Sequence, residues 1–243
     1  MIRPTKIEYG THHWPIVAGC RHGADTCAIS ADCWARGMAR RFHKDFTPTL
    51  HPARLNDPMP RKPGARILVS FTGDMFGEWW LTPELGEWDR LVFRCLTIVT
   101  MHPEHNFLFL TKNPSAYRLF HPWPKNAWVG ASITGAESRQ VQQARLDALR
   151  RVEGAGVLWL SYEPMLGPLM VDNLEGIGWL VIGAQAGKGR RVPLRAEVGH
   201  TWDLADNCSP VIPIWEKDNV RDRRLYLPWD AVQELPFDRM QAD

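Results

Sequence analysis

The stretch AWVGASITGAESRQVQQARLDALRRVEGAGVLWLSY, residues 127–162, decides the fold class of this chain. It starts with an apolar run at 127–133, continues through a helical pattern at 136–151 and ends in a second apolar run at 157–162. Near-continuous apolar strands on both sides of a helix are typical of a strand–helix–strand unit, in which the two strands lie parallel in one sheet. The stretch therefore predicts an α/β protein.

The same alternation extends outward in both directions. Further apolar runs predict strands at 66–71, 106–110, 179–184 and 211–215. Helical patterns lie at 34–43, 83–101 and 194–206, and a short helix is expected after Pro114. Such units fit a partial or complete (β/α) barrel of six to seven parallel strands better than an open sheet. We expect a single domain over 1–243, with a cysteine loop at 14–34 and a C-terminal extension at 216–243.

Charge and composition limit the classes of function. The net charge is +2, but residues 1–66 carry 11 Lys and Arg against 5 Asp and Glu, which suits a phosphate-bearing or nucleic-acid partner or a solvated basic surface. No apolar stretch approaches the length that spans a membrane, and the N-terminus lacks the apolar core of a signal peptide. An odd number of cysteines argues against a secreted disulfide scaffold, so we expect a cytoplasmic protein.

Three cysteines lie close together near the N-terminus, at Cys20, Cys27 and Cys33. Thiolates are soft ligands that select zinc, copper(I) or iron–sulfur clusters. Three ligands leave one coordination position open, which a catalytic metal site needs. Cys33 also stands at the expected start of the helix at 34–43, where a helix N-terminus lowers the pKa of a thiol. The cysteines therefore predict a metal or cluster site.

Polar residues follow several of the predicted strands. In α/β barrels, functional side chains gather at the carboxyl ends of the strands. The strand-end residues of this chain are Asp74, Lys112, Ser132, Glu163, Gln185 and Lys217. They are the candidate site residues outside the cysteine loop.

The chain resembles a phage- and prophage-associated family of radical-SAM-like proteins of unassigned function. The cysteine loop and the motifs FTPTLHP (46–52) and EPMLGPL (163–169) carry the resemblance, with shorter matches such as SFTGDMF and LTKNP between them. Five residues separate Cys27 from Cys33, where the family usually has two, and Gln185 stands where the family tends to carry an acidic residue. The resemblance implies a radical-SAM-like barrel and a host-cytoplasmic location if the chain is phage-encoded.

The resemblance also implies a function. Cys20, Cys27 and Cys33 would bind a [4Fe–4S] cluster whose open iron binds S-adenosylmethionine (SAM), and cleavage of SAM would give a 5′-deoxyadenosyl radical that takes hydrogen from a substrate. Such an enzyme, of the isomerase or lyase type, would need an electron donor such as flavodoxin or ferredoxin. We expect its substrate to be a nucleic-acid base or modified nucleoside, in phage DNA modification, rearrangement or repair.

Individual residues receive roles from the same resemblance. Trp34 would contact the adenine of SAM or shield the cluster, and Gly73 with Asp74 would meet the SAM amino group. Ser132 and Glu163 would face the SAM ribose or the substrate. The backbone at 183–187, which includes Gly183 and Gln185, would lie near adenine. The residues implied to act in catalysis or to bind the substrate are Glu163, Lys112 and Lys217.

Two other functions stay open. The cysteines would hold structural zinc if His22 or His43 supplied a fourth ligand, as in a zinc-stabilised nucleic-acid-binding protein. Alternatively, Asp74 and Glu163 would act as the acid/base pair of a barrel hydrolase, with the cysteines merely structural.

Overall fold

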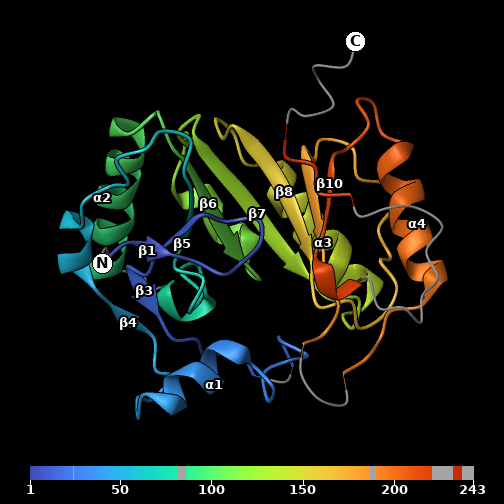
Figure 1. The fold of residues 1–243 in the computed structure, drawn as a ribbon, viewed down its shortest axis with the longest axis horizontal. Coiled ribbons are helices and arrows are strands. Elements are labelled where there is room, and N and C mark those ends of the chain that lie inside the picture. Colours follow the sequence, from blue (N-terminus) through green and yellow to red (C-terminus); the bar gives the residue numbers. More distant parts are fainter. Residues whose placement is uncertain (24, 82–85, 187–189, 221–231, 237–243) are drawn as a thin grey trace. The chain divides into compact units, whose positions relative to one another are not determined.

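The architecture comes from a computed structural model that describes residues 1–23, 25–81, 86–186, 190–220 and 232–236. Its α-helices are α1 (Trp34–Arg41), α2 (Glu87–Met101), α3 (Arg139–Arg150) and α4 (Arg195–Asp206). Short 3₁₀ helices are η1 (Pro52–Asn56), η2 (Glu78–Trp80), η3 (Pro114–Leu119) and η4 (Asp218–Val220). Figure 1 shows these helices and the sheet.

The strands form one large sheet and one small one. The strands are β1 (Arg3–Pro4), β2 (His12–Trp14), β3 (Val17–Ala18), β4 (Thr49–Leu50), β5 (Arg66–Val69), β6 (Asn106–Thr111), β7 (Ala127–Ile133), β8 (Val157–Tyr162), β9 (Trp179–Ile182) and β10 (Ile214–Glu216). The large sheet has eight strands in the order β1-β2-β5-β6-β7-β8-β9-β10, and β3 pairs with β4. The large sheet is largely parallel. β2 pairs with β5, β5 with β6, β8 with β9 and β9 with β10 in parallel, whereas β1 pairs with β2 and β3 pairs with β4 antiparallel.

The α/β class and the parallel sheet are confirmed, and all six strands predicted from apolar runs are present. The predicted runs 127–133 and 157–162 are β7 and β8 without any change of bounds. The last predicted strand starts later than expected, at Ile214, because Pro213 has no N–H to donate to the sheet. The first residues of the predicted helix at 83–101 lie outside the described residues. The barrel form and the single domain stay predictions.

The N-terminal strands β1 to β4 are not predicted from the sequence. β2 reads His-His-Trp, which lacks an apolar run, yet it pairs in parallel with β5 through His12 opposite Ile67 and Trp14 opposite Val69. The side chain of Trp14 is fully buried and donates from Nε1 to the Arg54 carbonyl at 2.8 Å. The burial of Trp14 therefore stabilises β2, although the neighbouring polar residues give this strand no apolar run in the sequence.

The chain divides into two compact units. The first contains residues 1–129 and 152–156, and the second contains 130–151 and 157–243. In the first unit, Phe76 lies at the centre of an aromatic cluster with Phe109, Tyr117 and Trp123. In the second unit, Trp159 packs on Trp179 across β8 and β9 at a centroid distance of 5.5 Å. Aromatic side chains thus fill the core of each unit.

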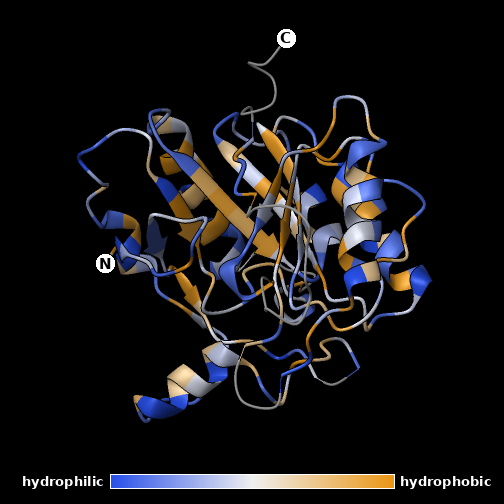
Figure 2. Cartoon of the chain, turned by 45° about the vertical axis from the view of Figure 1, so that its right-hand side comes forward, coloured by the Kyte–Doolittle hydropathy of each residue, from blue (hydrophilic) through white to orange (hydrophobic). Residues whose placement is uncertain are grey.

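Hydropathy follows the secondary structure. Figure 2 shows hydrophobic strands and helices whose outer faces are hydrophilic. On α2, the predicted apolar face is confirmed, because Trp88, Leu91, Cys95 and Val99 are buried. Among the described helices, none combines the length and the hydropathy that crossing a membrane requires.

Candidate functional site

The three cysteines lie on one loop between β3 and α1, and this loop is fixed against the segment that follows β5. Gly19 and Gly73 form a parallel β-bridge. The Gly19 N–H donates to the Thr72 carbonyl at 3.2 Å, and the Asp74 N–H donates to the Gly19 carbonyl at 3.3 Å. A Cβ on Gly73 would lie 2.5 Å from the Gly19 oxygen, so this close approach of two backbones requires glycine. The loop therefore starts at the carboxyl end of a strand, where α/β proteins bind ligands.

Cys20 lies at the protected start of the loop. Its Sγ accepts a hydrogen bond from the His22 N–H at 3.4 Å. Burial raises the pKa of the Cys20 thiol to about 12, and the charges of Asp74, Cys27 and Cys33 add to the rise. Cys27 and Cys33 are thus near enough to Cys20 for their charges to affect its pKa.

The other two cysteines are held by backbone contacts. Cys27 is buried, and its N–H donates to the Gly23 carbonyl at 2.9 Å. Cys33 is the residue before the first turn of α1, and its carbonyl accepts from the Gly37 N–H at 2.9 Å. The expectation that Cys33 stands at the start of a helix is confirmed. In the parts of the chain that the structure describes, no three His, Cys, Asp or Glu side chains are close enough to hold one metal ion.

Asp74 is a buried carboxylate with four hydrogen-bond donors. Oδ1 accepts from the Phe76 N–H at 2.9 Å and the Thr111 hydroxyl at 2.7 Å. Oδ2 pairs with His22 Nε2 at 2.8 Å and accepts from the Lys112 N–H at 3.2 Å. Burial alone would raise the pKa of Asp74, but the contacts with His22, Thr111 and Phe76 outweigh it and hold the pKa below its usual range. Asp74 therefore joins the cysteine loop to the ends of β5 and β6.

His22 connects Asp74 to the cysteine loop. Its Nε2 contacts Asp74, its Nδ1 lies 3.3 Å from the Thr26 hydroxyl, and its ring packs edge-on against Trp79 at 4.9 Å. Both ring nitrogens are thus already used by protein partners. From the sequence, His22 is a candidate zinc ligand, and only the fold shows that it is the partner of Asp74.

A second group of predicted residues meets in the second unit. Glu163, Gly183 and Lys217 follow the neighbouring strands β8, β9 and β10. Lys217 Nζ lies 2.5 Å from Glu163 Oε1, whereas Glu163 Oε2 is buried with no hydrogen-bond partner among the described residues. A Cβ on Gly183 would lie 3.0 Å from Lys217 Cδ and 3.3 Å from Glu163 Cβ. The structure thus brings these three strand-end residues together, as expected for parallel neighbours.

The remaining predicted residues have structural contacts. Gln185 Oε1 accepts from the Arg191 N–H at 3.0 Å, and the Arg191 guanidinium pairs with Glu197 at 2.6 Å. The carbonyl of the buried Ser132 accepts from Arg145 at 3.0 Å. Of the backbone predicted near adenine, Gly187 lies outside the described residues. The SAM contacts assigned to these residues stay predictions.

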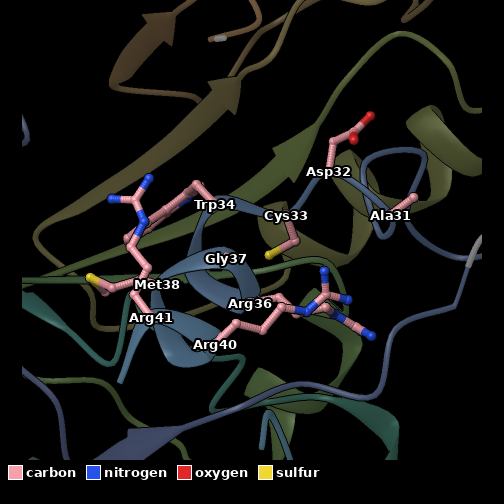
Figure 3. A pocket seen from close by; sticks show the side chains of 9 residues that line it. All are labelled: Ala31, Asp32, Cys33, Trp34, Arg36, Gly37, Met38, Arg40 and Arg41. Carbon is pink, nitrogen blue, oxygen red and sulfur yellow. The ribbon is translucent and has the colours of Figure 1, made fainter. Parts of the chain in front are cut away.

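A pocket of ≈ 380 Å³ lies along α1 and the end of the cysteine loop (Figure 3). Its lining residues are Ala31, Asp32, Cys33, Trp34, Arg36, Gly37, Met38, Arg40 and Arg41. Trp34 is 52% exposed, and it is the one exposed tryptophan in the part of the chain that the structure describes. The predicted cofactor-binding residue Trp34 and the predicted ligand Cys33 therefore line one pocket.

These features define an α/β protein with a largely parallel sheet and a three-cysteine loop fixed at the carboxyl end of β5. Residues 4–211 match the model of a protein family described as "Protein of unknown function (DUF5131)", and the chain belongs to this family. No curated protein and no solved structure matches the chain.

Proposed function

We propose that the chain is a radical SAM enzyme. The observation that carries the proposal is the placement of Cys20, Cys27 and Cys33 on one loop that is fixed, through Gly19 and Gly73, to the carboxyl end of a parallel strand. Three thiols at this edge of a sheet would bind a cofactor and leave one coordination position for a substrate.

The strand order supports the barrel form of this proposal. From β2 to β10, the strands of the large sheet follow one another in chain order. Crossovers between parallel strands are right-handed, so strands that follow in chain order place all their helices on the same face of the sheet. The opposite face is apolar and would remain in water unless the sheet curled into a partial (β/α) barrel, which would bury that face inside.

The donor set fits a [4Fe–4S] cluster. Thiolates are the protein ligands of such clusters, and Cys27 and Cys33 lie near enough to Cys20 for their charges to raise its pKa. Cys20, Cys27 and Cys33 would hold the cluster, and when bound it would supply the electron that cleaves SAM.

The residues around the loop position these ligands. The backbone bridge between Gly19 and Gly73 fixes where the loop begins. Asp74 and His22 hold the next turn, and the N–H of His22 points at Cys20 Sγ. A hydrogen bond to a ligating sulfur stabilises its negative charge and affects the redox potential of a cluster. Cys27 is buried and Cys20 is half-buried, which limits the access of water to this side of the loop.

The contacts assigned with SAM and substrate belong to the same proposal, except that the hydrogen bonds of Asp74 favour a role in positioning the cysteine loop. Trp34 lies in the wall of the α1 pocket and would shield the cluster there. Glu163 and Lys217 keep the roles expected for them, and Glu163 Oε2 is buried without a hydrogen-bond partner among the described residues. A nucleic-acid base remains the expected substrate, with flavodoxin or ferredoxin as the electron donor in the cytoplasm.

The geometry favours this function over the two alternatives. A Cys₃His zinc site through His22 would have to break the His22–Asp74 pair, because both ring nitrogens have partners. A hydrolase would need Asp74 as a proton donor or acceptor, but its two oxygens already meet four donors, and its pKa is low. The hydrolase alternative also gives the three thiols of the loop no part in the chemistry.

Anaerobic reconstitution with iron and sulfide tests the proposal. We expect about four iron and four sulfide per chain, as one [4Fe–4S] cluster requires, and release of 5′-deoxyadenosine from SAM after reduction. Ser in place of Cys20, Cys27 or Cys33 should abolish both. Cys208→Ser is the matched control, because a serine hydroxyl can keep the bond from Cys208 to the Leu204 carbonyl. A chain that binds one zinc and no iron, or that keeps its cluster in all three variants, would exclude a radical SAM enzyme.

A further inference from the structure

The segment from Trp34 to Lys44 is basic throughout. It contains Arg36, Arg40, Arg41 and Lys44 and no acidic residue. Arg40, Arg41 and Lys44 are exposed. Among the described residues, no carboxylate forms an ion pair with Arg36, Arg40 or Arg41. Arg36 and Arg40 are also neighbours one turn apart on α1, and like charges at this spacing destabilise a helix. A bound anion would remove this repulsion.

The Arg36 side chain contacts an aromatic ring, and its Nε donor has no hydrogen-bond partner among the described residues. Its guanidinium lies over the Phe46 ring at 5.4 Å, a cation–π contact that fixes the side chain. Its Nε is buried and has no hydrogen-bond partner among the described residues. A buried donor without a partner costs free energy unless a ligand supplies an acceptor. Planar guanidinium groups match phosphate oxygens in geometry.

Arg36, Arg40 and Arg41 line the same pocket as Cys33. In Figure 3, Arg36 and Arg40 extend to one side of α1, and Trp34, Met38 and Arg41 lie on the other. The spacing agrees, since Arg36 and Arg40 are four residues apart and Trp34 and Arg41 are seven. Asp32 is the one acidic residue of this lining.

Two exposed aromatic rings accompany the arginines. Trp34 is 52% exposed and Phe42 is 69% exposed. Leaving large aromatic surfaces in water is unfavourable, and most other tryptophans of the described chain are buried. Arginines that follow a phosphate backbone, next to aromatic rings on which bases stack, are typical of single-strand nucleic-acid binding.

We propose that α1 and its flanks, residues 31–44, bind single-stranded nucleic acid, with Arg36, Arg40 and Arg41 on phosphates and Trp34 stacked on a base. A membrane surface fits less well. α1 has eight residues and is about 12 Å long, and its arginines occupy both sides, whereas an interfacial helix needs a continuous apolar face. This inference goes beyond the proposed function, because binding requires neither the cluster nor SAM.

Fluorescence anisotropy with a labelled single-stranded DNA oligonucleotide tests the inference on the full-length chain. We expect Arg36→Ala/Arg40→Ala to weaken binding at least tenfold and to reduce the slope of log K against log salt by about 1.4, since each lost phosphate contact on a single strand removes about 0.7. Trp34→Ala should weaken binding about tenfold, and Trp34→Phe should restore most of it. The same oligonucleotide as RNA shows which sugar is preferred, and a duplex should bind more weakly.

The matched control is Arg90→Ala/Arg94→Ala, which removes two exposed arginines four residues apart on α2. This variant should bind like the wild type. Equal losses in both double variants would overturn the proposal, since the binding would then follow net charge alone. Binding to vesicles of phosphatidylcholine and phosphatidylglycerol without binding to the oligonucleotide would also overturn it. Loss of SAM cleavage with intact binding would count against the radical SAM proposal only.

Discussion

Replacement of Asp74 tests whether this carboxylate fixes the cysteine loop or is kept for a ligand. Asp74→Ala would leave the Phe76 and Lys112 amides, the Thr111 hydroxyl and the His22 ring without their acceptor. Each hydrogen bond to a charged group contributes about 1.5–3 kcal/mol, and the contributions are not additive, so we expect a loss of about 4 kcal/mol. Most domains have only about 5–15 kcal/mol of stability, so this loss is severe.

Smaller changes at the same site should give graded losses. Asp74→Asn keeps Oδ1 for Phe76 and Thr111 but turns an amide toward the Lys112 N–H, and we expect a loss of about 2 kcal/mol. Thr111→Val removes one donor and should cost about 1.5 kcal/mol. Thr97→Val is the matched control, because Thr97 is exposed and bonds only within α2; it should change stability by less than about 0.5 kcal/mol.

Urea unfolding followed by circular dichroism measures these losses, and hydrogen exchange of the Phe76 and Lys112 amides localises them. The effect depends on pH. Because the pKa of Asp74 is lower in the folded state than in the unfolded chain, its contribution is present above about pH 4 and is lost as the pH falls through the folded value. The reasoning fails if Asp74→Ala costs less than about 1 kcal/mol. It also fails if Asp74→Asn keeps full stability but binds SAM tenfold more weakly, since Asp74 would then be a ligand for SAM.

Three further predictions concern other parts of the fold. Gly73→Ala should lower the stability by about 3 kcal/mol, because the new Cβ would collide with the Gly19 backbone. Gly37→Ala on α1 meets nothing within 4 Å and should raise the stability by about 0.5–1 kcal/mol. Thermal unfolding compares the two variants, and equal effects would contradict the close approach of Gly73 to Gly19. Burial, Arg54 and the N-terminus lower the pKa of His13 to about 4, so stability should fall by roughly 3 kcal/mol as the pH drops from 6.5 to 4. His13→Gln should flatten this part of the urea-derived stability profile, and an unchanged slope would refute the assignment. A double-mutant cycle on Glu163→Gln and Lys217→Met should show coupling of about 1 kcal/mol or more; additive losses would mean that the ion pair contributes nothing.

The sequence predicts most of the sheet because its strands are apolar on both faces. The runs that became β7 and β8 contain seven and six residues, nearly all buried, and no polar periodicity competes with them. The helix α2 is predictable for a similar reason, since its apolar residues recur on one face. β2 is not predictable in this way, because two of its three residues are histidines and its pairing depends on a distant strand.

The candidate site is only half predictable from the sequence. The carboxyl ends of strands indicate Glu163 and Lys217, since parallel neighbours must end at the same edge of the sheet. The role of Asp74 is different, because its donors Thr111 and His22 are 37 and 52 residues away along the chain. Local pattern carries no information about such partners, and only the folded chain shows that Asp74 is saturated by them.

The way in which the cysteine loop is attached has a consequence for how the family can diversify. The backbones of Gly19 and Gly73 fix the start of the loop, and the first turn of α1 fixes its end. Between these ends, Ala28, Ala31 and Asp32 lie exposed between Cys27 and Cys33. Doubling the length of a flexible segment costs only about 0.6 kcal/mol, so insertions here are cheap. Relatives should therefore tolerate different numbers of residues between the second and third cysteines, whereas Gly19 and Gly73 should not tolerate substitution.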